Sequence, residues 1–139
     1  MMKHTPIAAA IFGAVILLSG CGQGKVEGKD ISASSSAGDI GKAYVAELTR
    51  IADALETVED EASARAAAAE IRKATDGLKN MEEELGGEVP GMKAMQIFGS
   101  NYEELANAQL RMMTALTQLQ AEHPELMEII GEETDRLGQ

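Results

Sequence analysis

Residues 95–119, MQIFGSNYEELANAQLRMMTALTQL, show the clearest structural pattern in this chain of 139 residues. Side chains recur there at steps of three and four, the spacing that places residues on one face of a helix. The residues on this face are Met95, Phe98, Tyr102, Leu105, Gln109, Met112, Leu116 and Leu119. We therefore expect one amphipathic helix that packs along this face in a bundle or coiled coil.

Two apolar stripes precede this segment and predict further helices. The first contains Tyr44, Leu48, Ile51, Leu55, Val58 and Ala62, and the second contains Ala64, Ala67, Ile71, Ala74, Leu78, Met81 and Leu85. The second stripe is out of register with the first, so either one long helix contains a stutter or two helices meet at a turn at 57–63. The turn is favoured because Asp60 and Ser63 can each cap a new helix.

The ends of the predicted helices coincide with residues that start or stop helices. Asp39 is the expected cap of the first helix, and Gly86 and Gly87 terminate the second. Pro90 opens the next segment, and Pro124 begins a short last helix. The expected fold of residues 39–139 is all-α, an up-down bundle of three amphipathic helices plus a short C-terminal helix.

Two features of these helices leave alternatives open. Gln109 is a polar residue on an otherwise apolar face, where it either fixes register and oligomeric state or reaches solvent at the rim. The run Ala66 to Ala69 presents small side chains around a helix, which permits close docking of an internal helix, a second copy or another protein. Internal packing is the favoured interpretation.

The charge balance limits the classes of partner. Twelve Lys and Arg residues stand against 23 Asp and Glu residues, a formal net charge of −11. Binding to nucleic acid needs basic residues to neutralise phosphates, and adsorption to anionic lipid heads needs them too. The composition therefore favours solubility or a basic partner. The single cysteine, Cys21, excludes a disulfide within the chain.

The first residues have the pattern of an export signal. Lys3 and His4 give a short basic start, and residues 7–18 form an unbroken run of apolar or small residues. Such a run has the length of a signal-peptide core and is too short to span a bilayer comfortably.

The four residues Leu18, Ser19, Gly20 and Cys21 resemble the bacterial lipobox. The resemblance implies cleavage between Gly20 and Cys21 and attachment of long acyl chains, such as palmitate, at Cys21. It covers the leader only, residues 1–20. Gly22 rather than aspartate follows the cysteine, which favours the outer membrane, facing the periplasm, over the inner membrane. Residues 21–38 are then the lipidated cysteine and a Gly/Ser-rich flexible linker.

No catalytic, metal or cofactor site is expected in the helical part. The clusters Glu82–Glu84, Glu103–Glu104 and Glu132–Glu133 are interpreted as solvated faces, because adjacent helical residues diverge by about 100°. His123 is the only histidine outside the leader, and it is interpreted as a helix-end residue rather than a catalytic or haem-binding one.

The function expected from these observations is a non-enzymatic adaptor of the cell envelope, anchored at Cys21, with an envelope protein partner or self-association. The alternative is a periplasmic carrier of a small molecule or cofactor in the bundle interior.

The lipobox assignment predicts that Cys21→Ser leaves the chain unprocessed or unanchored, because serine offers no sulfur for the thioether bond. Membrane fractionation and intact mass of the purified chain measure this. A Cys21→Ser protein that is still mature and still requires detergent would contradict the assignment.

Overall fold

The computed structural model describes residues 27–87 and 91–135. These residues are all-α, which confirms the predicted fold class. The three long helices are α1 (Ala37–Glu56), α2 (Glu61–Glu84) and α4 (Tyr102–Glu122), and the short ones are α3 (Gly91–Phe98) and α5 (Met127–Asp135). Two 3-10 turns, η1 (Gly28–Asp30) and η2 (Pro124–Leu126), precede α1 and α5.

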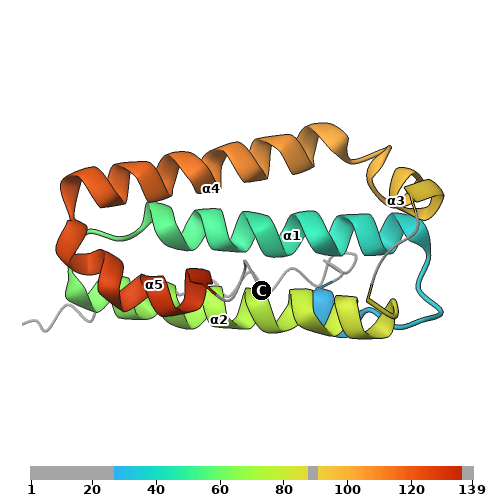
Figure 1. Ribbon diagram of the computed structural model, residues 1–139, viewed down its shortest axis with the longest axis horizontal. Helices are drawn as coiled ribbons and strands as arrows, with labels where there is room; N and C mark the ends of the chain where they lie inside the picture. Colours follow the sequence, from blue (N-terminus) through green and yellow to red (C-terminus); the bar gives the residue numbers. More distant parts are fainter. Residues whose placement is uncertain (1–26, 88–90, 136–139) are drawn as a thin grey trace, which may run out of the picture.

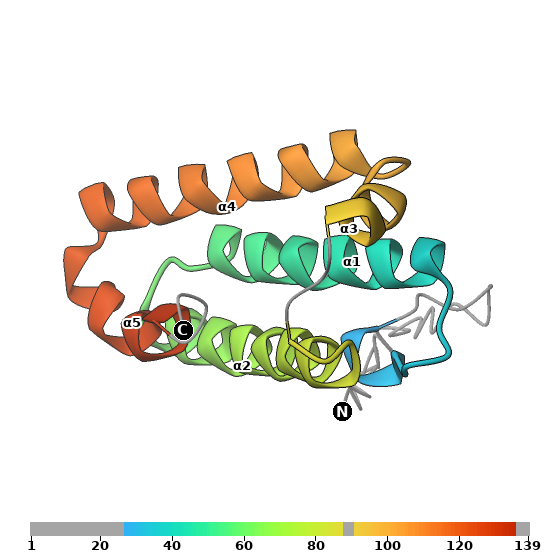
Figure 2. The ribbon, with the colours of Figure 1, turned by 45° about the vertical axis from the view of Figure 1, so that its right-hand side comes forward.

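Helix α1 lies between α2 and α4, and all three run roughly side by side (Figure 1; Figure 2). Helices α2 and α4 make their extensive contacts with α1 rather than with each other. Helix α5 packs on α2, and α3 packs on the N-terminal part of α1. In the described part of the chain, no helix has the length and hydropathy needed to cross a membrane.

The turn between the first two stripes is confirmed. Helix α1 ends at Glu56, and α2 begins at Glu61. Asp60 is the N-cap of α2, and its carboxylate accepts a hydrogen bond from the Ser63 N–H at 2.8 Å. Ser63 accepts a bond from the Asp60 N–H in return, which completes a capping box. The bond from the Ser63 N–H lowers the pKa of Asp60.

The start of α1 differs from the prediction. Ser36, not Asp39, is the N-cap, and its hydroxyl accepts the Asp39 N–H at 3.1 Å.

The predicted linker was too long, because the chain is already packed from residue 27 and Ile31 is only 3% exposed. The segment docks through Ile31 and through hydrogen bonds from its backbone to side chains of α1 and α2. The linker residues 22–26, and the predicted helix start at Pro90, lie outside the described residues.

The prediction of one helix over residues 95–119 was also wrong. The chain leaves helix α3 after Phe98 and re-enters helix α4 at Tyr102. Glycine at position 99 weakens a helix, and the Asn101 N–H bonds instead to the Phe98 carbonyl in a turn. This break lets the ring of Phe98 pack edge-on against Tyr44 of α1, with ring centroids 5.2 Å apart.

The break also changes which residues of α4 face the core. Leu119 is buried and Leu105, Met112 and Leu116 are half-buried, as expected. Tyr102 of the predicted face is exposed, and Ala108 and Ala115, which were not on that face, are buried. Gln109 is exposed, so of the two alternatives it reaches solvent at the rim. Small buried residues allow the backbone of α4 to lie close to α1.

The principal core lies where α1, α2, α4 and the C-terminal turn meet. Its largest fully buried members are Ile51, Ile71 and Ile130. Glu133 belongs to this buried layer rather than to a solvated face. It is 2% exposed, and the Arg72 Nε donates to its Oε1 at 2.8 Å. The acidic C-terminal cluster therefore ties α5 to α2.

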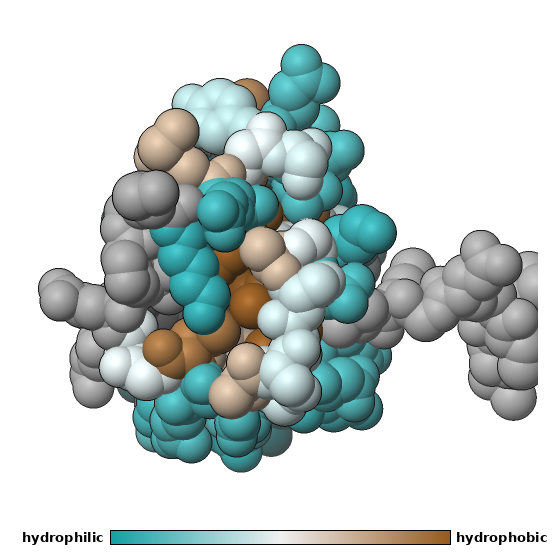
Figure 3. Space-filling model, turned by 90° about the vertical axis from the view of Figure 1, so that its right-hand side faces the viewer, coloured by the Kyte–Doolittle hydropathy of each residue, from teal (hydrophilic) through white to brown (hydrophobic). Residues whose placement is uncertain are grey.

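A smaller core holds the N-terminal segment and α3 at the opposite end of the bundle. It contains Ile31, Ile40, Ala43, Met81 and Ile97. Figure 3 faces this end, where hydrophobic residues are visible between hydrophilic ones. Gly41 allows α3 to approach α1, because a Cβ there would lie 2.1 Å from the Ile97 carbonyl oxygen.

Gly41→Ala is therefore predicted to push α3 away from α1 and to destabilise the protein by about 1–3 kcal/mol, the usual effect of overpacking. Gly38→Ala is the matched control, since its Cβ would meet only the Ser36 hydroxyl at 4.0 Å. Amide hydrogen exchange reports the change. Faster exchange in α3 with unchanged exchange in α2 is expected, and equal protection of α3 in both variants would contradict the packing described.

Candidate functional site

The outer face of α1, between α2 and α4, forms an open groove of about 900 Å³. We call it the α1 groove. Seven of its lining residues come from α1, and an eighth is its C-cap Thr57; the seven are Lys42, Val45, Ala46, Thr49, Arg50, Asp53 and Ala54. Ala66, Ala67 and Glu70 line it from α2, Asn101 and Glu104 from the start of α4, and Glu27 from the N-terminal segment.

The floor of the groove is made of small side chains. Val45, Ala46 and Thr49 are half-buried on the face of α1 that points away from the core. Ala66 lies in the wall and is exposed, whereas the neighbouring Ala67 is buried in the principal core. Within the alanine run Ala66 to Ala69, Ala67 packs internally and Ala66 is exposed to solvent. The interpretation that this run packs inside the domain is therefore confirmed for Ala67 and wrong for Ala66.

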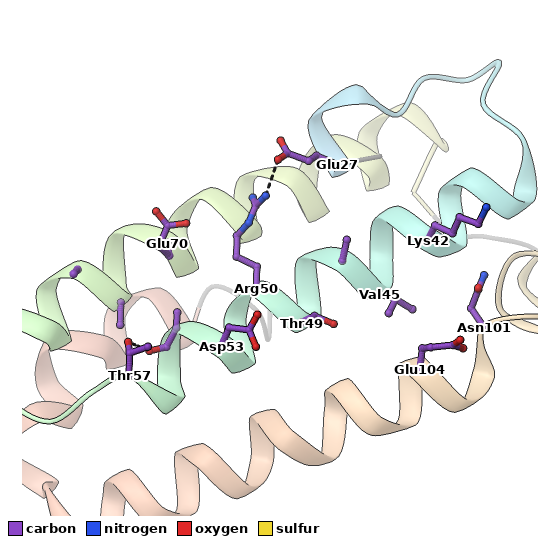
Figure 4. A pocket seen from close by; sticks show the side chains of 14 residues that line it. Glu27, Lys42, Val45, Thr49, Arg50, Asp53, Thr57, Glu70, Asn101 and Glu104 are labelled. Carbon is purple, nitrogen blue, oxygen red and sulfur yellow. Dashed lines mark hydrogen bonds and ion pairs between the residues drawn. The ribbon is translucent and has the colours of Figure 1, made fainter. Parts of the chain in front are cut away.

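One rim of the groove is fixed by ion pairs of Arg50, of which Figure 4 shows the pair with Glu27. Arg50 extends from α1 and donates from Nη2 to Glu27 Oε1 at 2.8 Å. Its Nη1 donates to Glu47 Oε2 at 3.1 Å. The side chain of Arg50 is 28% exposed, so both contacts are partly shielded from water. A bond from Lys29 lowers the pKa of Glu27, and the charge of Arg50 lowers it further.

Glu47 is the most unusual residue next to the groove, because it is a carboxylate that is only 1% exposed. Burial raises its pKa, since a charged carboxylate loses its hydration in the interior. The Gly28 N–H, 2.8 Å from Oε1, and the nearby Arg50 oppose this effect. The carboxylate therefore stays buried because both of its oxygens have partners.

The same carboxylate holds the N-terminal segment between α1 and α2. Gly28 lies so close to α2 that a Cβ there would be 2.4 Å from the Gly77 carbonyl oxygen. Asn80 donates from Nδ2 to the carbonyl oxygens of Gly28 at 2.8 Å and Ile31 at 3.2 Å. Residues 27–31 are thus hydrogen-bonded to α1 and to α2, and Glu27 of this segment forms part of the rim of the groove.

The opposite rim belongs to α4. Arg111 donates from Nη2 to Asp53 Oδ1 and to Glu56 Oε2, both at 2.6 Å, and these bonds raise its pKa. They connect α4 to α1 along the edge of the groove. At its far end, the buried Asn101 Nδ2 has no hydrogen-bond partner, and Glu104 lies beside it (Figure 4).

The residues singled out in the sequence for chemistry lie apart from the groove, with one exception. Glu104, from the cluster Glu103–Glu104, lines the groove, whereas Glu82–Glu84 are exposed at the end of α2. His123 ends α4, and its Nδ1 lies 3.4 Å from Glu125 Oε1. Within residues 27–87 and 91–135, no three His, Cys, Asp or Glu residues are placed to hold a metal ion. Cys21 and the cleavage site after Gly20 lie outside the described residues.

The sequence did not point to the groove. The charged groove residues of α1, Lys42, Arg50 and Asp53, lie on its polar face, where charged side chains are expected on any amphipathic helix. The available signal was the presence of Val45, Ala46 and Thr49 on that face, three small or apolar side chains where a solvated helix usually carries longer polar ones. Burial of Glu47 had no sequence signal, because its partner Gly28 lies in a stretch with the composition of a linker.

The raised pKa of Glu47 predicts a pH dependence that Glu47→Gln removes. The folded protein holds this proton more tightly than the unfolded chain, so the contribution of Glu47 to the free energy of unfolding falls as pH rises from about 4.5 through its raised folded-state pKa. The wild-type value minus the Glu47→Gln value should therefore decrease across that window and then level off. Urea unfolding of both proteins at a series of pH values measures it, and a difference that rises with pH would contradict the assignment.

No protein family, curated protein or solved structure matches this chain, so its function has to be inferred from the geometry of the groove.

Proposed function

We propose that the chain is a non-enzymatic adaptor of the cell envelope, lipid-anchored at Cys21 to the outer membrane and facing the periplasm. The observation that supports this function is the α1 groove, an open channel on the surface of a bundle whose own core is filled by Leu, Ile and Ala side chains. A surface of this kind suits binding of another chain more than chemistry on a small substrate.

The shape of the groove suits a helix as the bound segment. It follows α1, which has 20 residues and is therefore about 30 Å long. Helices α2 and α4 flank it, so a partner helix would complete a four-helix arrangement around this face. The small floor residues Val45, Ala46 and Thr49 leave room for a close approach of the partner backbone.

The charges of the groove favour a basic partner. Four carboxylates line it, against the two cations Lys42 and Arg50. Ion pairs within the chain use charges of both signs: Arg50 is paired with Glu27 and Glu47, Arg111 with Asp53, and Lys73 with Glu70. The excess of acid at the groove is therefore carried mainly by Glu104. Glu104 on α4 would face a lysine or arginine of a bound amphipathic helix, and Glu70 on the α2 side could exchange its exposed pair with Lys73 for such a residue.

The proposal predicts that Ala46→Arg blocks the groove and repels a basic partner without unfolding the half-exposed site. Ala69→Arg, at an exposed α2 position outside the lining, is the matched control. The measurement is crosslinking in intact cells followed by purification and mass spectrometry. The crosslinked peptide should be basic and amphipathic, and its yield should fall about tenfold or more in Ala46→Arg alone, as when about 1.4 kcal/mol of binding is lost.

Equal yields from both variants would contradict the groove as the binding surface. A partner peptide that is acidic would contradict the charge argument.

A carrier of a small molecule is the second candidate, because about 900 Å³ lies within the range of small-molecule pockets. In that case the ligand would occupy the outer groove rather than the bundle interior. Visible absorbance and native mass spectrometry of the purified chain separate the two functions. A bound small molecule that is lost in Ala46→Arg would favour the carrier.

A further inference from the structure

The N-terminal segment leaves the domain at the α1 groove. The Gly28 N–H donates to Glu47 of α1 at 2.8 Å, and Glu27 accepts a bond from Arg50, three residues further along the same helix, also at 2.8 Å. Glu27 is itself one of the residues that line the groove (Figure 4). The chain, followed toward its N-terminus, therefore leaves the described domain at the wall of the groove.

This exit point is fixed on the domain. Ile31 is 3% exposed in the smaller core, and Asn80 of α2 donates to the carbonyl oxygens of Gly28 and Ile31. Gly28 lies so close to α2 that a Cβ there would be 2.4 Å from the Gly77 carbonyl oxygen. Residues 27–31 are thus held between α1 and α2, and Glu27 keeps its place at the groove in the folded domain.

Five residues, 22–26, separate Cys21 from Glu27 in the sequence. A chain covers at most about 3.6 Å per residue, so the six steps from Cys21 to Glu27 span no more than about 22 Å. If Cys21 carries the lipid, as proposed above, the wall of the groove lies within that distance of the membrane surface. The inference drawn from this distance rests on the proposed anchor and on the proposed binding of a helix in the groove.

The short distance limits what can occupy the groove. The groove is the side of α1 nearest the anchor, because the principal core lies on the other side of the helix. A helix with its side chains is about 10–12 Å across, whereas a folded domain of about 100 residues, with a radius of gyration of about 13 Å, is about 30 Å across. The space between the groove and the membrane therefore admits a helix and excludes a folded domain.

The strength of such a contact indicates that the partner shares the membrane. One helix in an open groove of about 900 Å³ buries less than the roughly 800 Å² per partner of a stable complex. This contact is weak between free partners, and it strengthens when both are attached to one membrane, because their effective concentration rises.

We propose that the α1 groove faces the membrane and binds a basic amphipathic helix that lies on the membrane surface as part of a membrane-bound protein. Basic amphipathic helices are the class of helix that lies in the membrane–water interface. The apolar side of such a helix fits the floor residues Val45, Ala46 and Thr49, and its positive charge suits Glu104.

The test uses photo-crosslinking in intact cells that express the full chain. The probe is Lys42→benzoylphenylalanine, at an exposed position in the lining of the groove, and Ala69→benzoylphenylalanine, exposed on α2 outside the groove, is the matched control. Mass spectrometry identifies the crosslinked peptide. We expect a basic segment within about 20 residues of the membrane-embedded or lipid-attached part of its protein, since 20 helical residues span about 30 Å.

Removal of the anchor distinguishes this inference from the proposed function. Cys21→Ala, placed behind a leader with an ordinary cleavage site, leaves residues 27–135 unchanged and frees the domain from the membrane. The yield from the Lys42 probe should then fall about tenfold or more, because the shared membrane no longer concentrates the two partners.

A crosslink to a soluble protein, or a yield that Cys21→Ala leaves unchanged, would overturn the inference while the groove remains a binding surface. No crosslink above the Ala69 control in either chain would overturn binding in the groove and this inference together.

Discussion

Two long helices pack on α1 without packing extensively on each other, and the rest of the structure depends on this arrangement. Helix α1 gives one side to the core, through Leu48, Ile51 and Leu55, and leaves the other side as the floor of a groove. A complete four-helix bundle would cover that floor. The C-terminal helix α5 instead packs on α2 through Ile130 and the buried Glu133, so it does not occupy the groove.

The close fit around α1 comes from small residues and from one buried charge. Gly41 brings α3 close to α1, and Gly28 brings the N-terminal segment close to α2. A side chain on Gly77 of α2 would collide with Glu47 of α1. The buried Glu47 has a desolvation cost, which the Gly28 N–H and Arg50 offset. Glu47 of α1 thus contacts the N-terminal segment at Gly28, helix α2 at Gly77 and Arg50 at the rim of the groove.

Sequence patterns predicted the parts of the fold that local periodicity controls. The stripes of α1 and α2, the turn before Glu61 and the glycines after α2, with φ of +79° and +88° at Gly86 and Gly87, follow from spacing and helix-end chemistry. The break at Gly99 was missed because the apolar spacing continues across it. The docking of Gly28 and the burial of Glu133 were missed because they depend on partners far along the chain. The groove left only a weak local signal, the small or apolar Val45, Ala46 and Thr49 on the polar face of α1, because its walls come from α2 and α4.

If the α1 groove binds a partner, the outer face of α1 is accessible to solvent in the purified protein and is covered by the partner in the cell. A cysteine at Thr49, on the groove floor, tests this directly when its labelling by a small maleimide is compared in the purified protein and in intact cells. Ala69→Cys, outside the groove, gives the reference rate. We predict rapid labelling of Thr49→Cys in the purified protein and protection in cells, with Ala69→Cys labelled equally in both. Equal labelling of Thr49→Cys in the two settings would contradict a groove that is occupied in the cell.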